Sequence, residues 1–259
     1  MEQVNVKKDG MDLQYIKEQT HELCMAAVRR NGYALKYVKV QPPELCLAAV
    51  RQTGYALKLV KEQTSQLCMA AVRQNGWALE YVKEQTSELC MAAVRQNGYA
   101  LEFVKEQTPE VCMAAVRQNG LALHSVKDHT PELCMAAVRK DGFALWYVKE
   151  QNPQLCLAAV KEHGWALQYV REQTPELCLE AVRQDCDALK IVKDESTRKK
   201  LDAYLPQRAQ HNKSIYAFLL CHKRARVYPS LTYTKDTPLQ CLPEIVAREI
   251  AEHMFLEFQ

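Results

Sequence analysis

Apolar and polar positions recur along most of this chain with a fixed period of 22 residues. In the unit Thr108–Thr130, TPEVCMAAVRQNGLALHSVKDHT, leucine or valine, cysteine, alanine and valine recur at spacings of one, four and five. That spacing places them on one face of a helix. Thr108 suits the N-cap and Pro109 the first helical position. Glu110 follows in the first turn, where the helix dipole favours a carboxylate.

A glycine directly after Arg-Gln-Asn marks the expected end of this first helix, and we expect that glycine to be left-handed. A second short amphipathic segment follows, for example Tyr99–Lys105, where alanine, leucine and valine at spacings of one and four define the buried face. Neither helix would persist alone, because isolated helices below about 12–15 residues are marginal in water. The pattern therefore predicts an all-α solenoid of about eight two-helix repeats that stabilise one another by stacking.

The repeat array is predicted to cover residues 1–195. Two columns of residues keep the 22-residue spacing, and they are the cysteines Cys24, Cys46, Cys68, Cys90, Cys112, Cys134, Cys156 and Cys178 and the glycines Gly10, Gly32, Gly54, Gly76, Gly98, Gly120, Gly142 and Gly164. Glu2 occupies the cysteine position of the first unit, and Cys186-Asp187 replaces glycine and an aromatic residue in the last. Such departures are expected of terminal repeats that face water.

Residues 196–259 contain neither a glycine nor the 22-residue period. Helical patterns occur in Ser196–Leu205 and Ser214–Arg224, and Pro238–Phe258 closes the chain as an amphipathic helix. We predict that residues 196–259 form a separate, small helical C-terminal module.

Eleven cysteines in a chain of 259 residues raise the question of disulfides. Equivalent residues of neighbouring repeats should lie about 9–10 Å apart, whereas a disulfide requires Cα atoms within about 7 Å. The cysteine column is therefore interpreted as buried free thiols in a reducing cytosol. The sequence also lacks an apolar run of about 18–20 residues and a signal-like N-terminus, so we expect no membrane contact and a cytoplasmic location.

Charge is nearly balanced, with a net charge of +3 from 34 basic and 31 acidic side chains, which disfavours a nucleic-acid partner. Basic residues nevertheless form two columns, Arg29, Arg51, Arg73, Arg95, Arg117 and Arg139, and Lys39, Lys61, Lys83, Lys105, Lys127 and Lys149. Cationic columns can follow a phosphate backbone. Because glutamates such as Glu84 and Glu106 stand beside the lysines, the preferred interpretation is a solvated surface of paired charges.

An aromatic column follows the glycines directly. Its members are Tyr33, Tyr55, Trp77, Tyr99, Phe143 and Trp165, and a second set, Tyr37, Tyr81, Phe103, Tyr147 and Tyr169, follows one turn later. The simpler interpretation is packing between repeats. The alternative is a protein-binding strip, because aromatic side chains are common interface anchors. Trp146 stands at a position that is otherwise mostly charged or polar and is the strongest single binding candidate.

Motifs of catalysis and metal binding are missing from the sequence. There is no C-x-x-C pair and no H-E-x-x-H, the seven histidines are scattered, and Cys221-His222 is an isolated dipeptide. No two glycines lie closer than 22 residues, which argues against a glycine-rich nucleotide loop. We therefore expect no enzymatic activity, no metal and no cofactor.

The unit C-x-A-A-V-x-x-N-G-x-A-L-x-Y-V resembles the repeat catalogued as domain of unknown function 4116, which is seen in giant DNA viruses of amoebae and in some bacteria. The resemblance covers about residues 2–195 and implies a helical repeat fold without an established activity. The tail segment Leu242-Pro243-Glu244-Ile245-Val246-Ala247-Arg248-Glu249-Ile250 is similar to the opening of an F-box. That similarity implies docking onto a cullin-type ubiquitin ligase through Leu242, Pro243, Ile245 and Ile250.

These observations favour a non-enzymatic protein-binding scaffold or adaptor, of viral origin as the resemblance implies, whose C-terminal module recruits a second partner. Its location would then be the host cytoplasm or the virion. One alternative is a structural or virion-assembly component that uses the solenoid as a spacer. Near-identical stretches such as Val72–Thr86 and Val94–Thr108 favour that alternative. A second alternative is nucleic-acid binding through the basic segment 198–226.

Overall fold

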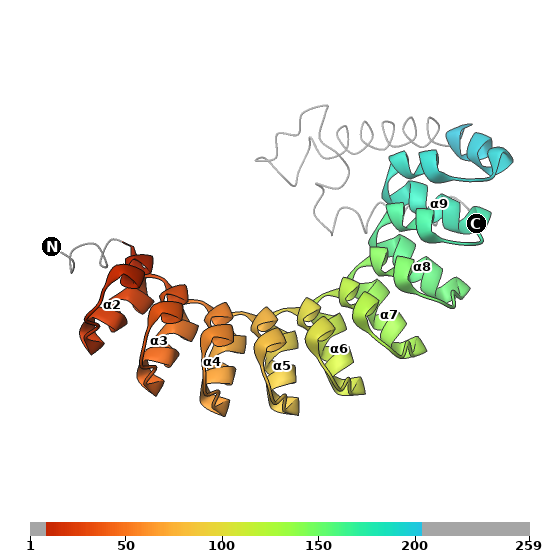
Figure 1. Cartoon of the computed structure of the whole chain (residues 1–259). Helices are drawn as coiled ribbons and strands as arrows, with labels where there is room; N and C mark the ends of the chain where they lie inside the picture. The colour runs from red at the N-terminus through yellow and green to blue at the C-terminus, as the bar shows by residue number, and fades with distance from the viewer. Residues whose placement is uncertain (1–8, 204–259) are drawn as a thin grey trace, which may run out of the picture. The chain divides into compact units, whose positions relative to one another are not determined.

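The computed structural model describes residues 9–203, in which 3-10 helices of six residues alternate with α-helices of ten residues (Figure 1). The 3-10 helices are η1 (Gly10–Tyr15), η2 (Gly32–Tyr37), η3 (Gly54–Leu59), η4 (Gly76–Tyr81), η5 (Gly98–Phe103), η6 (Gly120–Ser125), η7 (Gly142–Tyr147), η8 (Gly164–Tyr169) and η9 (Cys186–Ile191). The α-helices are α2 (His21–Arg30), α3 (Pro43–Gln52), α4 (Ser65–Gln74), α5 (Ser87–Gln96), α6 (Pro109–Gln118), α7 (Pro131–Lys140), α8 (Pro153–Glu162) and α9 (Pro175–Gln184). The predicted all-α repeat fold is confirmed.

The predicted caps begin most of the α-helices. Thr108 accepts a hydrogen bond from the backbone N–H of Val111 at 3.4 Å, and Pro109 occupies the first turn of α6. Hydrogen bonds from the backbone N–H of Glu110 and from Thr108 lower the pKa of the Glu110 carboxyl. Helix α3 differs, because its N-cap is Pro42, whose side chain makes no capping hydrogen bond.

The prediction that the glycine is left-handed is wrong, since no residue in the described part of the chain has a positive φ. Asn97 ends α5 in an extended conformation, and its side chain accepts from the backbone N–H of Tyr99, which starts η5 without an intervening loop. The glycine is instead required by the following repeat. A Cβ on Gly98 would lie 2.6 Å from the carbonyl oxygen of Ala115 in α6. Gly98 therefore permits close packing of η5 against α6.

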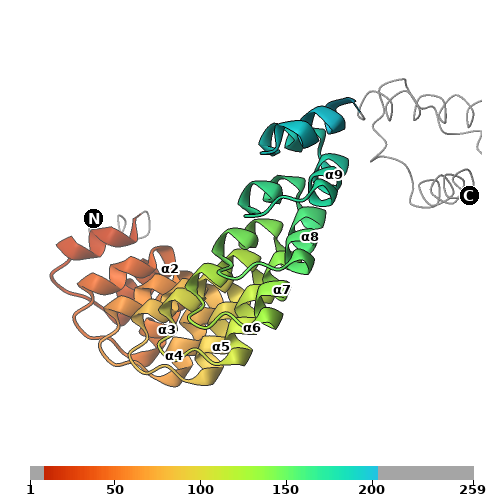
Figure 2. The ribbon, with the colours of Figure 1, turned by 90° about the vertical axis from the view of Figure 1, so that its right-hand side faces the viewer.

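Each α-helix packs against the α-helices before and after it and against the 3-10 helices of its own and the preceding repeat. Figures 1 and 2 both show the α-helices side by side along the array. The core of one repeat consists of buried aliphatic and small side chains, which in the repeat of α5 and η5 are Leu89, Cys90, Ala93, Val94, Ala100, Leu101 and Val104. The cysteines of this column are free and buried in residues 9–203, as predicted.

Glutamines at two recurring positions link neighbouring repeats through the main chain. Those at the end of an α-helix accept the backbone N–H of the glycine in the preceding repeat, as Gln118 does from Gly98 at 2.7 Å. Those directly before the N-cap of an α-helix make more contacts. Gln85 donates its amide N–H to the carbonyl oxygen of Phe103 at 2.8 Å and accepts from the backbone N–H of Lys105 at 3.0 Å. Its oxygen also accepts from the thiol of Cys90 at 3.7 Å. Equivalent contacts to the next repeat are made by Gln19, Gln41, Gln63, Gln107, Gln151 and Gln173. We call this arrangement the glutamine staple.

The array ends as a terminal repeat should. Cys186 occupies the glycine position of the last 3-10 helix and is exposed, as is Asp187. The chain divides into two compact units, Met1–Tyr204 and Leu205–Gln259. Residues 195–203 are helical, which agrees with the helix expected from Ser196. Glu2 lies outside the described residues. So do the helices that the sequence predicts after residue 203.

Candidate binding face formed by the 3-10 helices

Three positions of the 3-10 helices η2–η8, with Lys190 of η9 added to the third, form a surface that we call the 3-10 face. The first column, directly after the glycine, contains Tyr33, Tyr55, Trp77, Tyr99, Leu121, Phe143 and Trp165. The second column, four residues later, contains Tyr37, Leu59, Tyr81, Phe103, Ser125, Tyr147 and Tyr169. The third column, directly before the second, contains Lys36, Lys58, Glu80, Glu102, His124, Trp146, Gln168 and Lys190, all of them exposed.

First-column rings contact second-column rings of the next repeat. The ring centroids of Tyr55 and Tyr81 lie 6.0 Å apart in an edge-to-face arrangement, and those of Trp77 and Phe103 lie 5.9 Å apart. The predicted packing between repeats is therefore confirmed. These rings stay only half-buried, and Trp77 is 36% exposed, so the same ladder also presents aromatic surface to the solvent.

Two third-column side chains, Lys58 and His124, lie between the rings of the two flanking repeats. The ammonium group of Lys58 is 5.2 Å from the ring centroid of Tyr33 and 5.9 Å from that of Tyr81. His124 lies in the same way between Tyr99 and Tyr147, at 6.1 and 5.7 Å. Lys58 and His124 are thus supported on aromatic surface while their outer sides face the solvent.

Trp146 is the most exposed tryptophan of this face. Its indole is 66% exposed and packs edge-on against Tyr169 with 5.0 Å between the ring centroids. An indole held in place by a neighbouring ring but open on its outer side is suited to bury against a partner. The sequence already showed that the other residues at this position are mostly charged or polar. It did not show that side chains such as Lys58 lie beside aromatic rings of the neighbouring repeats. Binding at Trp146 stays a prediction.

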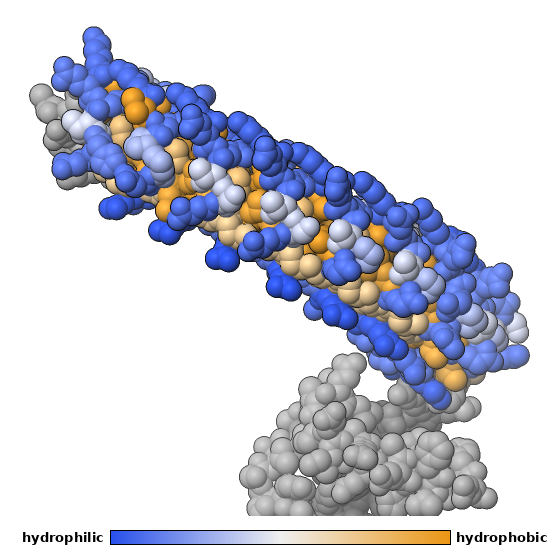
Figure 3. Space-filling model, turned by 90° about the horizontal axis from the view of Figure 1, so that it is seen from below, coloured by the Kyte–Doolittle hydropathy of each residue, from blue (hydrophilic) through white to orange (hydrophobic). Residues whose placement is uncertain are grey.

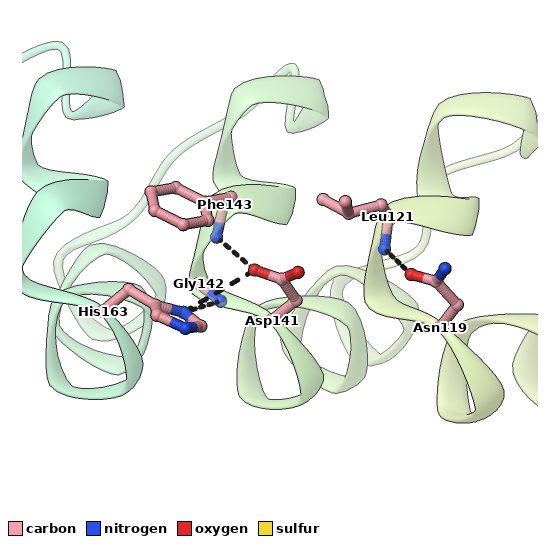
Figure 4. Close-up of polar contacts among 6 residues, drawn as sticks. All are labelled: Asn119, Leu121, Asp141, Gly142, Phe143 and His163. Atoms are coloured by element: carbon pink, nitrogen blue, oxygen red, sulfur yellow. Dashed lines mark hydrogen bonds and ion pairs between the residues drawn. The ribbon is translucent and has the colours of Figure 1, made fainter.

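His163, which directly follows α8, alters the face beside η7 (Figure 4). Its ring stacks on Phe143 with 4.8 Å between centroids, and its Nδ1 accepts the backbone N–H of Gly142 at 3.1 Å. The carboxylate of Asp141 lies 3.6 Å from the same nitrogen and accepts the backbone N–H of Phe143 at 2.9 Å. Because Nδ1 accepts from Gly142, the geometry describes an unprotonated Nδ1, and the contact with Asp141 is not a charged pair in this state. Phe143 is consequently covered on one face.

The lysine column is exposed, as predicted, but its pairing differs from the prediction. Lys105 donates its ammonium N–H to the carbonyl oxygen of Lys83 at 2.9 Å, and Lys83 donates likewise to Lys61 at 3.3 Å. These lysines therefore bind main-chain oxygens of the preceding repeat and not the neighbouring glutamates. Each lysine side chain lies along the array, and so it reaches the equivalent loop 22 residues earlier in the chain.

Apolar surface extends along the array. Half-buried apolar side chains recur in every repeat, such as Met91 and Ala92 on α5 and Tyr99 on η5. Figure 3 shows an apolar band on one face of the array with hydrophilic margins on both sides. Repetition of the same partly covered positions therefore produces continuous apolar surface and not isolated patches.

Other predicted sites lie partly or wholly outside residues 9–203. The tail positions Leu242, Pro243, Ile245 and Ile250 are not among the described residues, and the basic segment 198–226 is described only to residue 203. Within residues 9–203 no group of three or more potential metal ligands occurs. In that part of the chain no helix has the length and apolar content to cross a membrane. The expectation that the chain is not an enzyme stays a prediction.

The fold and the ladder of contacts between repeats define this molecule as a helical-repeat protein. The family described as Domain of unknown function (DUF4116) matches it in four overlapping segments, residues 65–109, 86–129, 108–152 and 130–174. The repeats in this part of the chain thus match the repeat family that the sequence resemblance predicted. No curated protein and no solved structure matches the chain.

Proposed function

We propose that this chain is a non-enzymatic scaffold that binds a protein partner along its 3-10 face. The observation that carries the proposal is Trp146, an indole 66% exposed within a ladder of half-buried aromatic rings. Aromatic anchors surrounded by partly covered side chains are typical of interface hot spots. The backbone behind the ladder is fixed by the glutamine staples, so little conformational freedom remains to be lost on binding.

A structural component that uses the solenoid as a spacer, in a virion or another assembly, is the second candidate. The glutamine staples favour it, because they give one geometry to the repeats that carry them without reference to any ligand. Recruitment of ubiquitin-ligase machinery by residues 196–259 stays a prediction, as does nucleic-acid binding by the segment 198–226.

The proposal is tested by affinity purification of the chain from a cytosolic lysate, with quantitative mass spectrometry of the proteins recovered. Trp146→Ala removes the exposed indole. Leu157→Ala, which shortens an apolar side chain 37% exposed on α8, is the matched control outside the 3-10 face. We expect at least one protein to be depleted by Trp146→Ala roughly 30-fold, as for an interface hot spot, and retained by Leu157→Ala.

Two results would contradict the proposal. If the proteins recovered with the native chain are all retained by Trp146→Ala, the 3-10 face is not the binding face. If the native chain recovers no protein above a bead control, the scaffold proposal fails and the spacer becomes the better account.

A further inference from the structure

Differences between the repeats are concentrated on the 3-10 face. Val72–Thr86 and Val94–Thr108 differ at only two positions, where Trp77 and Tyr81 correspond to Tyr99 and Phe103. Both positions belong to the first and second columns. The α-helices, in contrast, repeat CMAAVR or a close variant of it.

The third column varies most, and its charges are arranged in order along the array. Lys36 and Lys58 are followed by Glu80 and Glu102. Next come His124 and Trp146, and then Gln168 and Lys190, in the sequence order of the repeats. Two cationic repeats are thus followed by two anionic ones, and an exposed indole stands two repeats further on. All of these side chains are exposed and none belongs to a glutamine staple.

The aromatic surroundings of Lys58 strengthen the ionic contacts that its ammonium group can make. The ammonium group of Lys58 lies above two rings, at 5.2 Å from Tyr33 and 5.9 Å from Tyr81, so part of its hydration is already replaced. An ion pair formed there is less screened than one on an open surface, where such pairs contribute little. A partner with opposite charges at the matching spacing would therefore be selected by the third column.

The repeat spacing fits an extended chain. Neighbouring helices pack about 9–10 Å apart, and an extended polypeptide advances about 3.3 Å per residue, so about three residues cover one repeat. From Lys36 to Trp146 the array advances by five repeats, and about 15 residues of extended chain span that length.

We infer that the 3-10 face binds an extended protein segment with acidic side chains at Lys36 and Lys58, basic side chains at Glu80 and Glu102, and a large apolar side chain at Trp146. This inference rests on the proposed function and specifies the chemistry of its partner. A nucleic-acid strand does not fit the same face, because its phosphates are uniformly negative and would be repelled by Glu80 and Glu102.

The test uses a phage-displayed library of random peptides of about 16 residues, long enough to span Lys36 to Trp146. It is selected on the native chain and on two variants. The first is Trp146→Ala. The second is a charge-swapped variant with Lys36→Glu, Lys58→Glu, Glu80→Lys and Glu102→Lys, whose net charge is unchanged. Circular dichroism establishes that the swapped variant is folded, and the single change Glu102→Lys provides a milder variant.

On the native chain we expect enrichment of peptides with three features in order. Two acidic residues about three positions apart come first, two basic residues with the same spacing follow, and an apolar residue lies beyond the basic ones. On the swapped variant the basic residues should come first and the acidic residues should lie nearer the apolar one. Peptides selected on the native chain should bind the swapped variant at least roughly tenfold more weakly. Glu102→Lys should reduce the preference for the basic residue nearer the apolar one.

The outcomes separate this inference from the proposed function. Enriched peptides that need Trp146 but show no order of charges, or that bind the swapped variant equally well, overturn the inference and leave the proposed binding face standing. If no enriched peptide depends on Trp146, both the inference and the binding face are overturned.

Discussion

At the scale of single residues, the glycine of each repeat is required by the repeat that follows it. A Cβ on Gly142 would lie 2.3 Å from the carbonyl oxygen of Ala159, nearer than side-chain atoms approach an oxygen. Where no further 22-residue repeat follows, the position accepts Cys186, which is exposed. The sequence pattern showed that the glycines matter, but the reason is contact between repeats and not backbone conformation.

Gly98→Ala tests this explanation. The added methyl group would overlap the carbonyl oxygen of Ala115, at 2.6 Å, and overpacking of this kind costs about 1–3 kcal/mol. Chemical unfolding followed by circular dichroism should show that loss. Cys186→Ala is the matched control and should change the free energy of unfolding by less than half as much. Equal effects of the two changes would show that the contact with Ala115 is not the cause.

The cysteine column makes the free energy of unfolding decrease at alkaline pH. Burial raises the pKa of the Cys90 thiol, and the same direction and cause apply to Cys68, Cys112, Cys134 and Cys156. A thiol whose pKa is raised by folding stays protonated in the native state while the unfolded chain loses its proton. The stabilisation is therefore complete below about pH 8.5, the pKa of a free thiol, and falls as pH rises through the native pKa.

We expect the free energy of unfolding, measured with reductant present, to decrease between pH 8 and pH 10, and the decrease to be the sum over the buried thiols. A variant with Cys68→Ala, Cys90→Ala and Cys112→Ala should start from a lower stability and show a shallower decrease. If the variant and the native chain show the same slope, other groups cause the pH dependence.

At the scale of elements, the repeats are joined by the glutamine staple, and one junction lacks it. His129 occupies the staple position before α7, and its Nδ1 is buried without a hydrogen-bond partner in the described structure. A buried polar atom left unpaired costs more than a hydrogen bond gains. This junction is therefore the weakest of the array in hydrogen bonding.

Restoring the glutamine should strengthen that junction. His129→Gln would supply an amide to the carbonyl of Tyr147 and an acceptor to the backbone N–H of Lys149, and we expect a gain of about 0.5–1.5 kcal/mol in the free energy of unfolding. Gln85→Ala, which removes a formed staple, should cost about 1–3 kcal/mol. A loss of stability in His129→Gln, or no loss in Gln85→Ala, would contradict the role given to the staple.

The sequence predicted the period, the N-caps, the buried cysteines and the extent of the core, because each follows from spacing and residue type within one repeat. It did not predict that the second helix is a 3-10 helix, since its apolar positions suit either form over six residues. It also missed the glutamine staple and the contacts of third-column side chains with rings of neighbouring repeats. Both depend on which residues meet across repeats, for example Gln85 with Phe103, and one repeat alone does not contain that information.

At the scale of the whole molecule, the described array is a stack in which each repeat contacts mainly its neighbours. Its stability is then a sum of repeat and junction contributions. Asn97 and Asn119 occupy equivalent positions, so removal of residues 97–118 joins equivalent backbone positions and preserves every type of junction.

We expect the chain lacking residues 97–118 to keep its helical signal per residue, and to unfold with a smaller denaturant slope because less surface becomes exposed. Removal of residues 97–107 alone brings mismatched positions together and should abolish cooperative unfolding. If the deletion of a complete repeat is as damaging as that of half a repeat, the additive description of the array is wrong.

The central claim is that the 3-10 face is the binding face, and the chain carries a direct reporter of it. All three tryptophans, Trp77, Trp146 and Trp165, lie in the first and third columns. The most enriched library peptide is titrated into the native chain while tryptophan emission and peptide anisotropy are recorded together. We predict a shift of emission to shorter wavelength that saturates at the same concentration as anisotropy. Saturating anisotropy with unchanged emission would place the peptide elsewhere and contradict the account.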